Sequence, residues 1–190
     1  MQHRAKKFST RAKAIASAAA VAAVGAGVAG AFSASADTTS AAPAAAPIAV
    51  GSEATTTSAH LTADAATRAA RAALDAAEQE GQRVTVAVVD RNGNTVVTLR
   101  GDGAGPQSYE SAVRKAFTAV AWNAPTSELA ERLENAPNLK DIPGTLFLGG
   151  GAPVAHDDAP IAGIGVAGAP SGDLDEKFAR AGVAALGDGR

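Results

Sequence analysis

Apolar residues recur every three to four positions along residues 108–122, which predicts an amphipathic helix with one side in the core. Its expected core side consists of Val113, Ala116, Phe117 and Val120. Ser108 is placed to cap the first turn, and Pro125 disfavours helix continuation. A second row on the helix consists of Ser111, Lys115, Thr118 and Trp122. This row combines an amine, hydroxyl groups and the only tryptophan, so it is a candidate binding surface.

Alternating β-branched residues predict two strands at 84–90 and 94–100. Asn92-Gly93 lies between them and is a strong signal for a hairpin turn. Residues 161–167 form a further predicted strand with several glycines, and residues 146–148 are short and apolar. The segment from Gly149 to Pro153 is expected to turn the chain.

Three more helices are predicted, over residues 61–80, 126–135 and 175–186. Thr62 caps the first helix and Gly81 ends it, while its inner side carries mainly alanine. Thr126 or Ser127 is expected to cap the second. The order of these elements favours an α+β fold, in which helices pack on an antiparallel sheet.

Residues 1–36 have the features of an export signal. A basic start precedes an uncharged Ala/Val/Gly stretch, and Ala34-Ser35-Ala36 matches the small-x-small pattern of a signal-peptidase site. A membrane anchor is the alternative, but the stretch is only weakly apolar. We therefore expect a secreted protein that is cleaved near Ala36, with the export route left open.

The remaining chain divides into an Ala/Pro/Thr-rich linker at 37–56 and one domain at 57–190. After position 36 the chain keeps all 19 acidic residues but only 12 of the 17 basic ones, which gives a formal net charge of −7. No basic cluster remains, so a nucleic-acid partner is not expected. Because the chain has no cysteine, disulfides cannot stabilise it.

Several catalytic and binding motifs are absent from the sequence. Gly149-Gly150-Gly151 lacks the Lys and Ser/Thr of a phosphate-binding loop, and no G-x-S-x-G nucleophile motif occurs. Carboxylates at i and i+3 are candidate ligands for ferric iron, although neighbouring arginines favour a solvated helix surface instead. These candidates are Asp75, Glu78, Glu128, Glu131 and Glu134.

Four sequence segments together resemble the GlcG/HbpS family. They are Ala87-Val-Val-Asp90 followed by Gly93, the Ser111–Ala119 segment, Gly150-Gly151-x-Pro153, and Gly163-Ile-Gly-Val-x-Gly168 followed by Asp175. The resemblance extends from about Leu61 to Leu186 in the expected order. Ala167 departs from it, since many relatives have serine there.

The resemblance implies a profilin-like fold, haem binding and a homo-oligomer, an octamer in the secreted branch. It further implies haem, iron or redox sensing, and in some members a membrane sensor kinase as partner. Two alternatives remain open: a haem-degrading or weakly peroxidase-like enzyme, and an oligomeric interaction module without a ligand. No distal acid–base pair for the enzyme is evident in the sequence.

Haem requires an apolar wall, cations for the propionates and a ligand for the iron. The row with Lys115, Thr118 and Trp122 offers a cation, an oxygen and an aromatic plane, with Ser111 beside it. Tyr109 and His156 are the candidates for a stronger ligand. Without cysteine, thiolate ligation is excluded.

Overall fold

The computed structural model describes residues 47–187, of which residues 50–187 belong to one compact unit. In chain order, its elements are η1 (Ser52–Ala54), α1 (Ala63–Gln79), β1 (Thr85–Asp90), β2 (Thr95–Arg100), α2 (Gln107–Trp122), α3 (Thr126–Glu131), η2 (Arg132–Glu134), η3 (Pro137–Asp141), β3 (Gly151–His156), β4 (Ala159–Ala167) and α4 (Gly172–Gly187). No helix among the described residues is long and apolar enough to cross a membrane.

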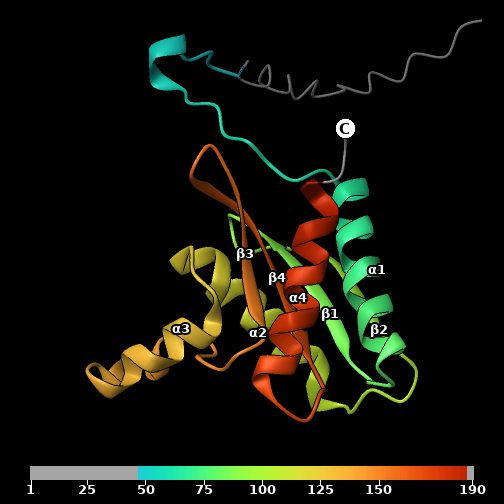
Figure 1. The fold of residues 1–190 in the computed structure, drawn as a ribbon. Coiled ribbons are helices and arrows are strands. Elements are labelled where there is room, and N and C mark those ends of the chain that lie inside the picture. Colours follow the sequence, from blue (N-terminus) through green and yellow to red (C-terminus); the bar gives the residue numbers. More distant parts are fainter. Residues whose placement is uncertain (1–46, 188–190) are drawn as a thin grey trace, which may run out of the picture. The chain divides into compact units, whose positions relative to one another are not determined.

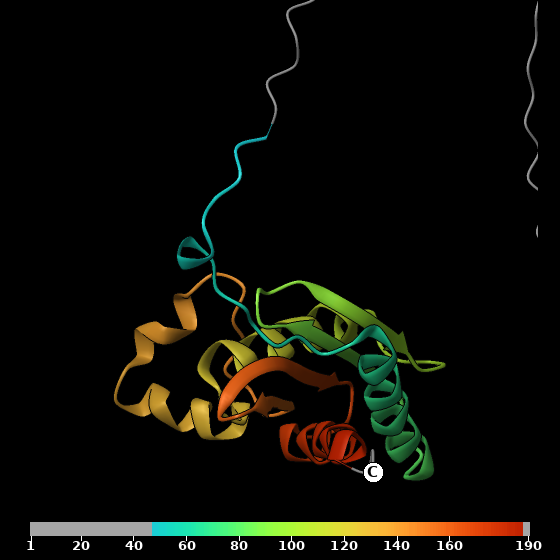
Figure 2. The same ribbon diagram turned by 90° about the horizontal axis from the view of Figure 1, so that it is seen from above.

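The four strands form an antiparallel sheet in the order β2-β1-β4-β3. Helices α1 and α4 cover one face of the sheet, and α2 lies behind the other (Figure 1). The view from above shows α1 and α4 along the same side (Figure 2). The predicted α+β architecture, with helices on an antiparallel sheet, is confirmed.

The face under α1 and α4, called the α1/α4 face below, is filled by side chains. Alanines of α1 pack with Phe178 of α4 against Val86, Val88, Ile164 and Val166 of the central strands. Thr62 caps α1 as predicted, because its hydroxyl accepts a hydrogen bond from the Ala65 N–H. Alanine lets α1 approach closely, so this face is a closely packed apolar core.

The opposite face, called the α2 face below, brings a helix onto bare backbone. A Cβ at Gly163 would overlap the Ala116 carbonyl oxygen, and a Cβ at Gly165 would overlap that of Ala112. The glycines of β4 are therefore required for α2 to dock at this distance.

This docking changes which side of α2 is buried. Alanines 112, 116 and 119 face the sheet together with Val120, whereas Val113 and Phe117 are only partly buried. Of the predicted core side, Ala116 and Val120 are buried as expected, whereas Val113 and Phe117 are not, so the observed core side is rotated towards Ala112 and Ala119. The cause is that close backbone contact selects the smallest side chains rather than the most apolar ones.

Two predicted helix caps are wrong. Ser108 lies inside α2, donates to the Gly105 carbonyl oxygen and bonds the hydroxyl of Thr85. The hydroxyl of Thr126 accepts from the Gly151 N–H rather than from its own helix. In both cases the hydroxyl that was expected to cap the helix instead bonds a residue far away in the sequence, Thr85 for Ser108 and Gly151 for Thr126.

The region before the last hairpin also differs from expectation. Residues 146–148 form no strand, and residues 151–156, expected to begin as a turn, form the edge strand β3. Pro153 is tolerated there because an edge strand has one side without ladder hydrogen bonds. The α-helix expected over 126–135 ends at Glu131, and the short 3₁₀ helix η2 follows it directly.

The predicted leader (1–36) and the first part of the linker lie outside the described residues. Residues 47–60 are exposed, and η1 is their only regular element. The predicted division at residues 36 and 56 stays a prediction.

Candidate ligand-binding groove

An apolar groove of about 410 Å³ runs between the start of α3, strand β3 and helix α4. Its lining residues are Pro125, Ala152, Pro153, Arg180, Val183 and Ala184. Only Arg180 among them is charged, and its side chain is 58% exposed. The groove thus offers an apolar wall with one cation at its border, which suits an apolar ligand that carries a carboxylate.

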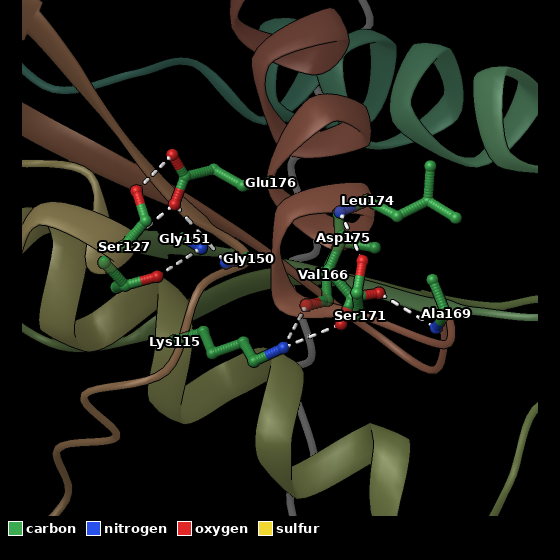
Figure 3. A network of polar contacts seen from close by, with 11 residues as sticks. Lys115, Ser127, Gly150, Gly151, Val166, Ala169, Ser171, Leu174, Asp175 and Glu176 are labelled. Atoms are coloured by element: carbon green, nitrogen blue, oxygen red, sulfur yellow. Dashed lines mark hydrogen bonds and ion pairs between the residues drawn. The ribbon is translucent and has the colours of Figure 1, made fainter. Parts of the chain in front are cut away.

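A buried carboxylate holds this cation in place. Glu176 lies one turn before Arg180 on α4, and its Oε1 accepts from the guanidinium at 2.7 Å. Its carboxylate also accepts from the Ser127 N–H at 3.0 Å and from the Ser127 hydroxyl at 2.8 Å. Figure 3 shows Glu176 reaching towards Ser127 and Gly150. The start of α3, the turn before β3 and α4 are thereby fixed to one another.

A second buried carboxylate belongs to the same network. Asp175 accepts from the Lys115 ammonium at 2.8 Å and from the Ala169 N–H at 3.0 Å. Lys115 also donates to the Val166 carbonyl oxygen at 3.0 Å (Figure 3). The pair therefore ties α2 to the beginning of α4 past the end of β4, and it is almost completely buried.

The two adjacent carboxyls respond in opposite ways to their surroundings. Burial raises the pKa of Asp175 above its ordinary value, although the Lys115 ammonium acts in the other direction. Burial also acts to raise the pKa of Glu176, but hydrogen bonds from Arg180 and Ser127 bring it below its ordinary value.

The predicted binding row on α2 is not an exposed surface. Lys115 and Thr118 are buried, with relative exposures of 2% and 0%. The Thr118 hydroxyl donates to the Arg114 carbonyl oxygen and accepts from the Leu146 N–H. Lys115 is paired with Asp175, so its ammonium is not free to meet a propionate. The loop before β3 and the start of α4 cover these two side chains, and their role in ligand binding stays a prediction.

The other members of the predicted row are partly accessible. Ser111 and Trp122 are half-buried. Trp122 packs edge-on against Phe147, and the Arg132 guanidinium lies 5.9 Å from its ring centre. Trp122 thus belongs to a small cluster beneath α3 rather than to the groove.

The two candidates for a stronger iron ligand lie on different surfaces. Tyr109 is 54% exposed on the outer side of α2. His156 ends β3, the strand that lines the groove, and its exposed imidazole lies 3.4 Å from the Asp157 carboxylate. Only His156 shares an element with the groove.

The predicted iron ligands do not converge on one site. Arg71 pairs with Asp75 at 2.7 Å and with Glu78 at 3.4 Å. Glu128, Glu131 and Glu134 are exposed, and the change from α3 to η2 breaks their helical spacing. Within residues 47–187 no group of three or more His, Asp and Glu side chains is arranged to hold a metal. Iron binding stays a prediction.

A second hollow, of about 510 Å³, lies at the C-terminal end of α1. Its lining is mainly polar and consists of Glu78, Gly81, Gln82, Arg83, Gly101 and Asp102. Although it is larger than the groove, it lacks the apolar wall that a macrocycle requires.

Sequence reasoning missed Arg180, Glu176 and Asp175 as parts of a site. Their only local signal is the i, i+4 spacing of Glu176 and Arg180, which is common on solvated helices. The burial of both carboxylates depends on segments up to 60 residues away.

Comparisons with known proteins agree with this fold. A double mutant of HbpS from Streptomyces reticuli is 74% identical, has a TM-score of 0.75, and is matched over 76% of this chain and 99% of that one. The crystal structure of a PduOC:haem complex is 30% identical, has a TM-score of 0.62, and is matched over 67% of this chain and 95% of that one.

Among curated proteins, the corrinoid adenosyltransferase PduO of Salmonella typhimurium is 34% identical over 124 residues, which are 63% of this chain. The chain spans only 37% of the length of that relative. The sequence model described as "Haem degrading protein HbpS-like" matches residues 61–184. The chain therefore belongs to the HbpS-like family.

Proposed function

We propose that the protein binds haem in the groove between α3, β3 and α4 and serves in haem or redox sensing outside the cell. The observation that carries haem binding is membership of a family in which a relative of the same fold forms a haem complex. The groove adds a place on this chain whose chemistry suits the ligand.

The residues of the groove fit a porphyrin in two respects. Pro125, Pro153 and Val183 supply apolar surface. The Arg180 guanidinium has five N–H donors, and its bond to Glu176 leaves it able to donate to a propionate as well. Because Glu176 fixes the guanidinium, less side-chain entropy is lost when the propionate binds.

His156 is the proposed ligand of the iron. It lies three residues beyond Pro153 on β3, a distance of about 10 Å along a strand. Bound haem would supply redox chemistry at its iron, and a single exposed imidazole would leave it exchangeable. Exchange suits sensing better than electron transfer.

Hemin titration followed in the Soret band tests this assignment. Arg180→Ala should weaken binding without moving the band, whereas His156→Ala should alter the band itself. Lys177→Ala is the matched control, because Lys177 is an exposed cation on the same helix and pairs with Glu80, the residue that follows α1. Tyr109→Phe should have no effect.

Three outcomes would contradict parts of the proposal. A change in the Soret band with Tyr109→Phe but not with His156→Ala would move the haem to the outer side of α2. Equal effects of Arg180→Ala and Lys177→Ala on hemin affinity would exclude the groove as the haem-binding site. Absence of any hemin binding would favour the interaction module without a ligand.

Haem degradation is the second candidate function, because the description of the family names it. Loss of the Soret band with formation of an open-chain tetrapyrrole, in the presence of dioxygen as the oxidant and a reductant as electron donor, would support this function. A band that persists over many hours would favour binding alone.

Export and the sensory partner complete the proposal. The basic start, the uncharged stretch and Ala34-Ser35-Ala36 support cleavage near Ala36. Mass spectrometry of the secreted protein should find Asp37 or a near neighbour at the N-terminus.

A membrane sensor kinase is the proposed protein partner. If the kinase is the partner, the haem-loaded protein should change the autophosphorylation rate of the kinase.

A further inference from the structure

Four successive residues shortly before α1 all carry a hydroxyl group. They are Thr55, Thr56, Thr57 and Ser58, called the hydroxyl cluster below. Serine and threonine make up five of the seven residues from 52 to 58, but fewer than one in ten of residues 59–190. Prolines at positions 43 and 47 precede the cluster. Segments rich in serine and threonine, with proline nearby, are typical of O-glycosylated stalks.

The hydroxyl cluster is open to solvent along its whole length. All of its residues are exposed, and no regular element lies between η1 and α1. Thr55 has extended backbone angles, with φ −125° and ψ 152°. Because successive side chains of an extended chain point to opposite sides, neighbouring hydroxyls can each carry a bulky group without crowding. A modifying enzyme can therefore reach the cluster while the domain stays folded.

The hydroxyls of the cluster take no part in packing the domain. Hydroxyls inside the domain do, as those of Thr85 and Ser108 show by bonding each other at 2.7 Å. Among residues 47–187, the two central threonines of the cluster have no side-chain hydrogen bond, and its first and last residues bond only within the segment 52–60. A group attached to these oxygens would therefore break no contact of the fold.

The acceptor groups restrict the kind of modification. The chain contains no Asn-x-Ser or Asn-x-Thr sequence, so an asparagine-linked glycan has no acceptor. Phosphorylation would require a nucleoside triphosphate, which the proposed export leaves inside the cell, and it would place negative charge close to Glu53. A neutral sugar on the hydroxyl oxygen meets neither difficulty.

We infer that the hydroxyl cluster accepts O-linked hexoses during or after export. The hydroxyl oxygen forms a bond to the anomeric carbon of a lipid-linked hexose phosphate, and the bond from that carbon to the phosphate oxygen breaks. The phosphate leaves with the bonding electron pair, the hydroxyl proton passes to a base of the transferase, and nothing is oxidised or reduced. This inference rests on the export part of the proposed function and is independent of haem binding.

Mass spectrometry of the protein secreted by its own organism tests the inference. Its mass should exceed that of the cleaved sequence by a whole number of anhydrohexose units. Trypsin should release residues 37–68 as one peptide, because this stretch contains no lysine or arginine before Arg68. Electron-transfer fragmentation of the peptide should place the sugars on residues 55–58, and alkaline β-elimination should remove them.

Replacing the four hydroxyls separates the cluster from other acceptors. The variant Thr55→Ala/Thr56→Ala/Thr57→Ala/Ser58→Ala should lose the added mass on this peptide. Thr95→Ala is the control, because it removes an exposed threonine hydroxyl that lies in strand β2, and it should keep the full added mass. Hemin titration of both variants should match that of the unchanged protein, since neither substitution touches the groove.

Several results would overturn the inference. They are an unmodified peptide 37–68, phosphate in place of hexose, sugars placed only outside residues 55–58, or an added mass that the fourfold variant keeps. An N-terminus near Asp37 with an unmodified cluster would overturn this inference alone and leave the proposed export standing. An intact Met1 on protein retained in the cell would overturn both.

Discussion

The two faces of the sheet are built on different principles. The α1/α4 face joins helices to strands through interlocking aliphatic side chains around Phe178. On the α2 face, helix α2 packs directly on the glycine backbone of β4, and the buried Lys115–Asp175 pair joins α2 to α4. Side chains can repack after a substitution, whereas a backbone contact or a buried charge has little freedom to adjust. The α2 face should therefore be the less tolerant of the two.

The largest effect is expected when the buried ion pair is broken. Lys115→Met leaves the Asp175 carboxylate buried without its cation, which typically costs 3–5 kcal/mol, so we expect a loss of about 4 kcal/mol in the free energy of unfolding. Urea denaturation measures it. The double variant Lys115→Met/Asp175→Asn should recover part of the loss, and an equal or larger loss would show that the pair does not act as a unit.

The next largest effect is expected from the glycine contact. Gly165→Ala places a methyl group against the Ala112 carbonyl oxygen, which can move only with the helix. We expect a loss of about 3 kcal/mol, at the upper end for overpacking. Thermal unfolding followed by circular dichroism measures it, and a loss below about 1 kcal/mol would mean that α2 shifts easily.

Ile164 precedes Gly165 in β4 but its side chain packs on the α1/α4 face, so a substitution there should lower the free energy of unfolding by less. Ile164→Val removes one methylene from the α1/α4 face, and we expect a loss of about 1 kcal/mol. The same thermal measurement applies. The proposed contrast between the faces would fail if this variant were as unstable as Gly165→Ala.

The smallest effect is a dependence on pH that only the polar network should show. The folded-state pKa of Glu176 lies below its ordinary value of 4.5, so its contribution to stability is present above pH 4.5 and is lost as the pH falls through the folded value. The deficit in Tm of Glu176→Gln should therefore be larger at neutral pH than at pH 3. The deficit of Ile164→Val should stay constant, and parallel pH profiles of the two variants would contradict this assignment.

Local patterns predicted most of the elements because their causes are local. Thr62 caps α1 through its own first turn, and Asn92-Gly93 closes the β1–β2 hairpin. The family resemblance likewise rests on short segments that can be read along the chain. By contrast, β3 was missed because it begins with Gly151 and has a proline as its third residue, and its strand character depends on pairing with β4.

What the sequence could not decide is which side of each helix would be buried. Periodicity marked Val113 and Phe117 as core together with Ala116 and Val120. Ala116 and Val120 are buried as predicted, but Gly163 and Gly165 turn the side with Ala112 and Ala116 to the sheet and leave Val113 and Phe117 partly buried.

The same limit applies to the candidate site. Lysine side chains are usually exposed, and nothing near Lys115 in the sequence indicates that it is buried. Its partner Asp175 lies 60 residues later and supplies the charge that permits this burial. The groove joins α3, β3 and α4, so its lining exists only after these segments have packed. The sequence determined the local elements and the family, whereas tertiary packing decided the site, because burial and charge pairing depend on residues far apart in the chain.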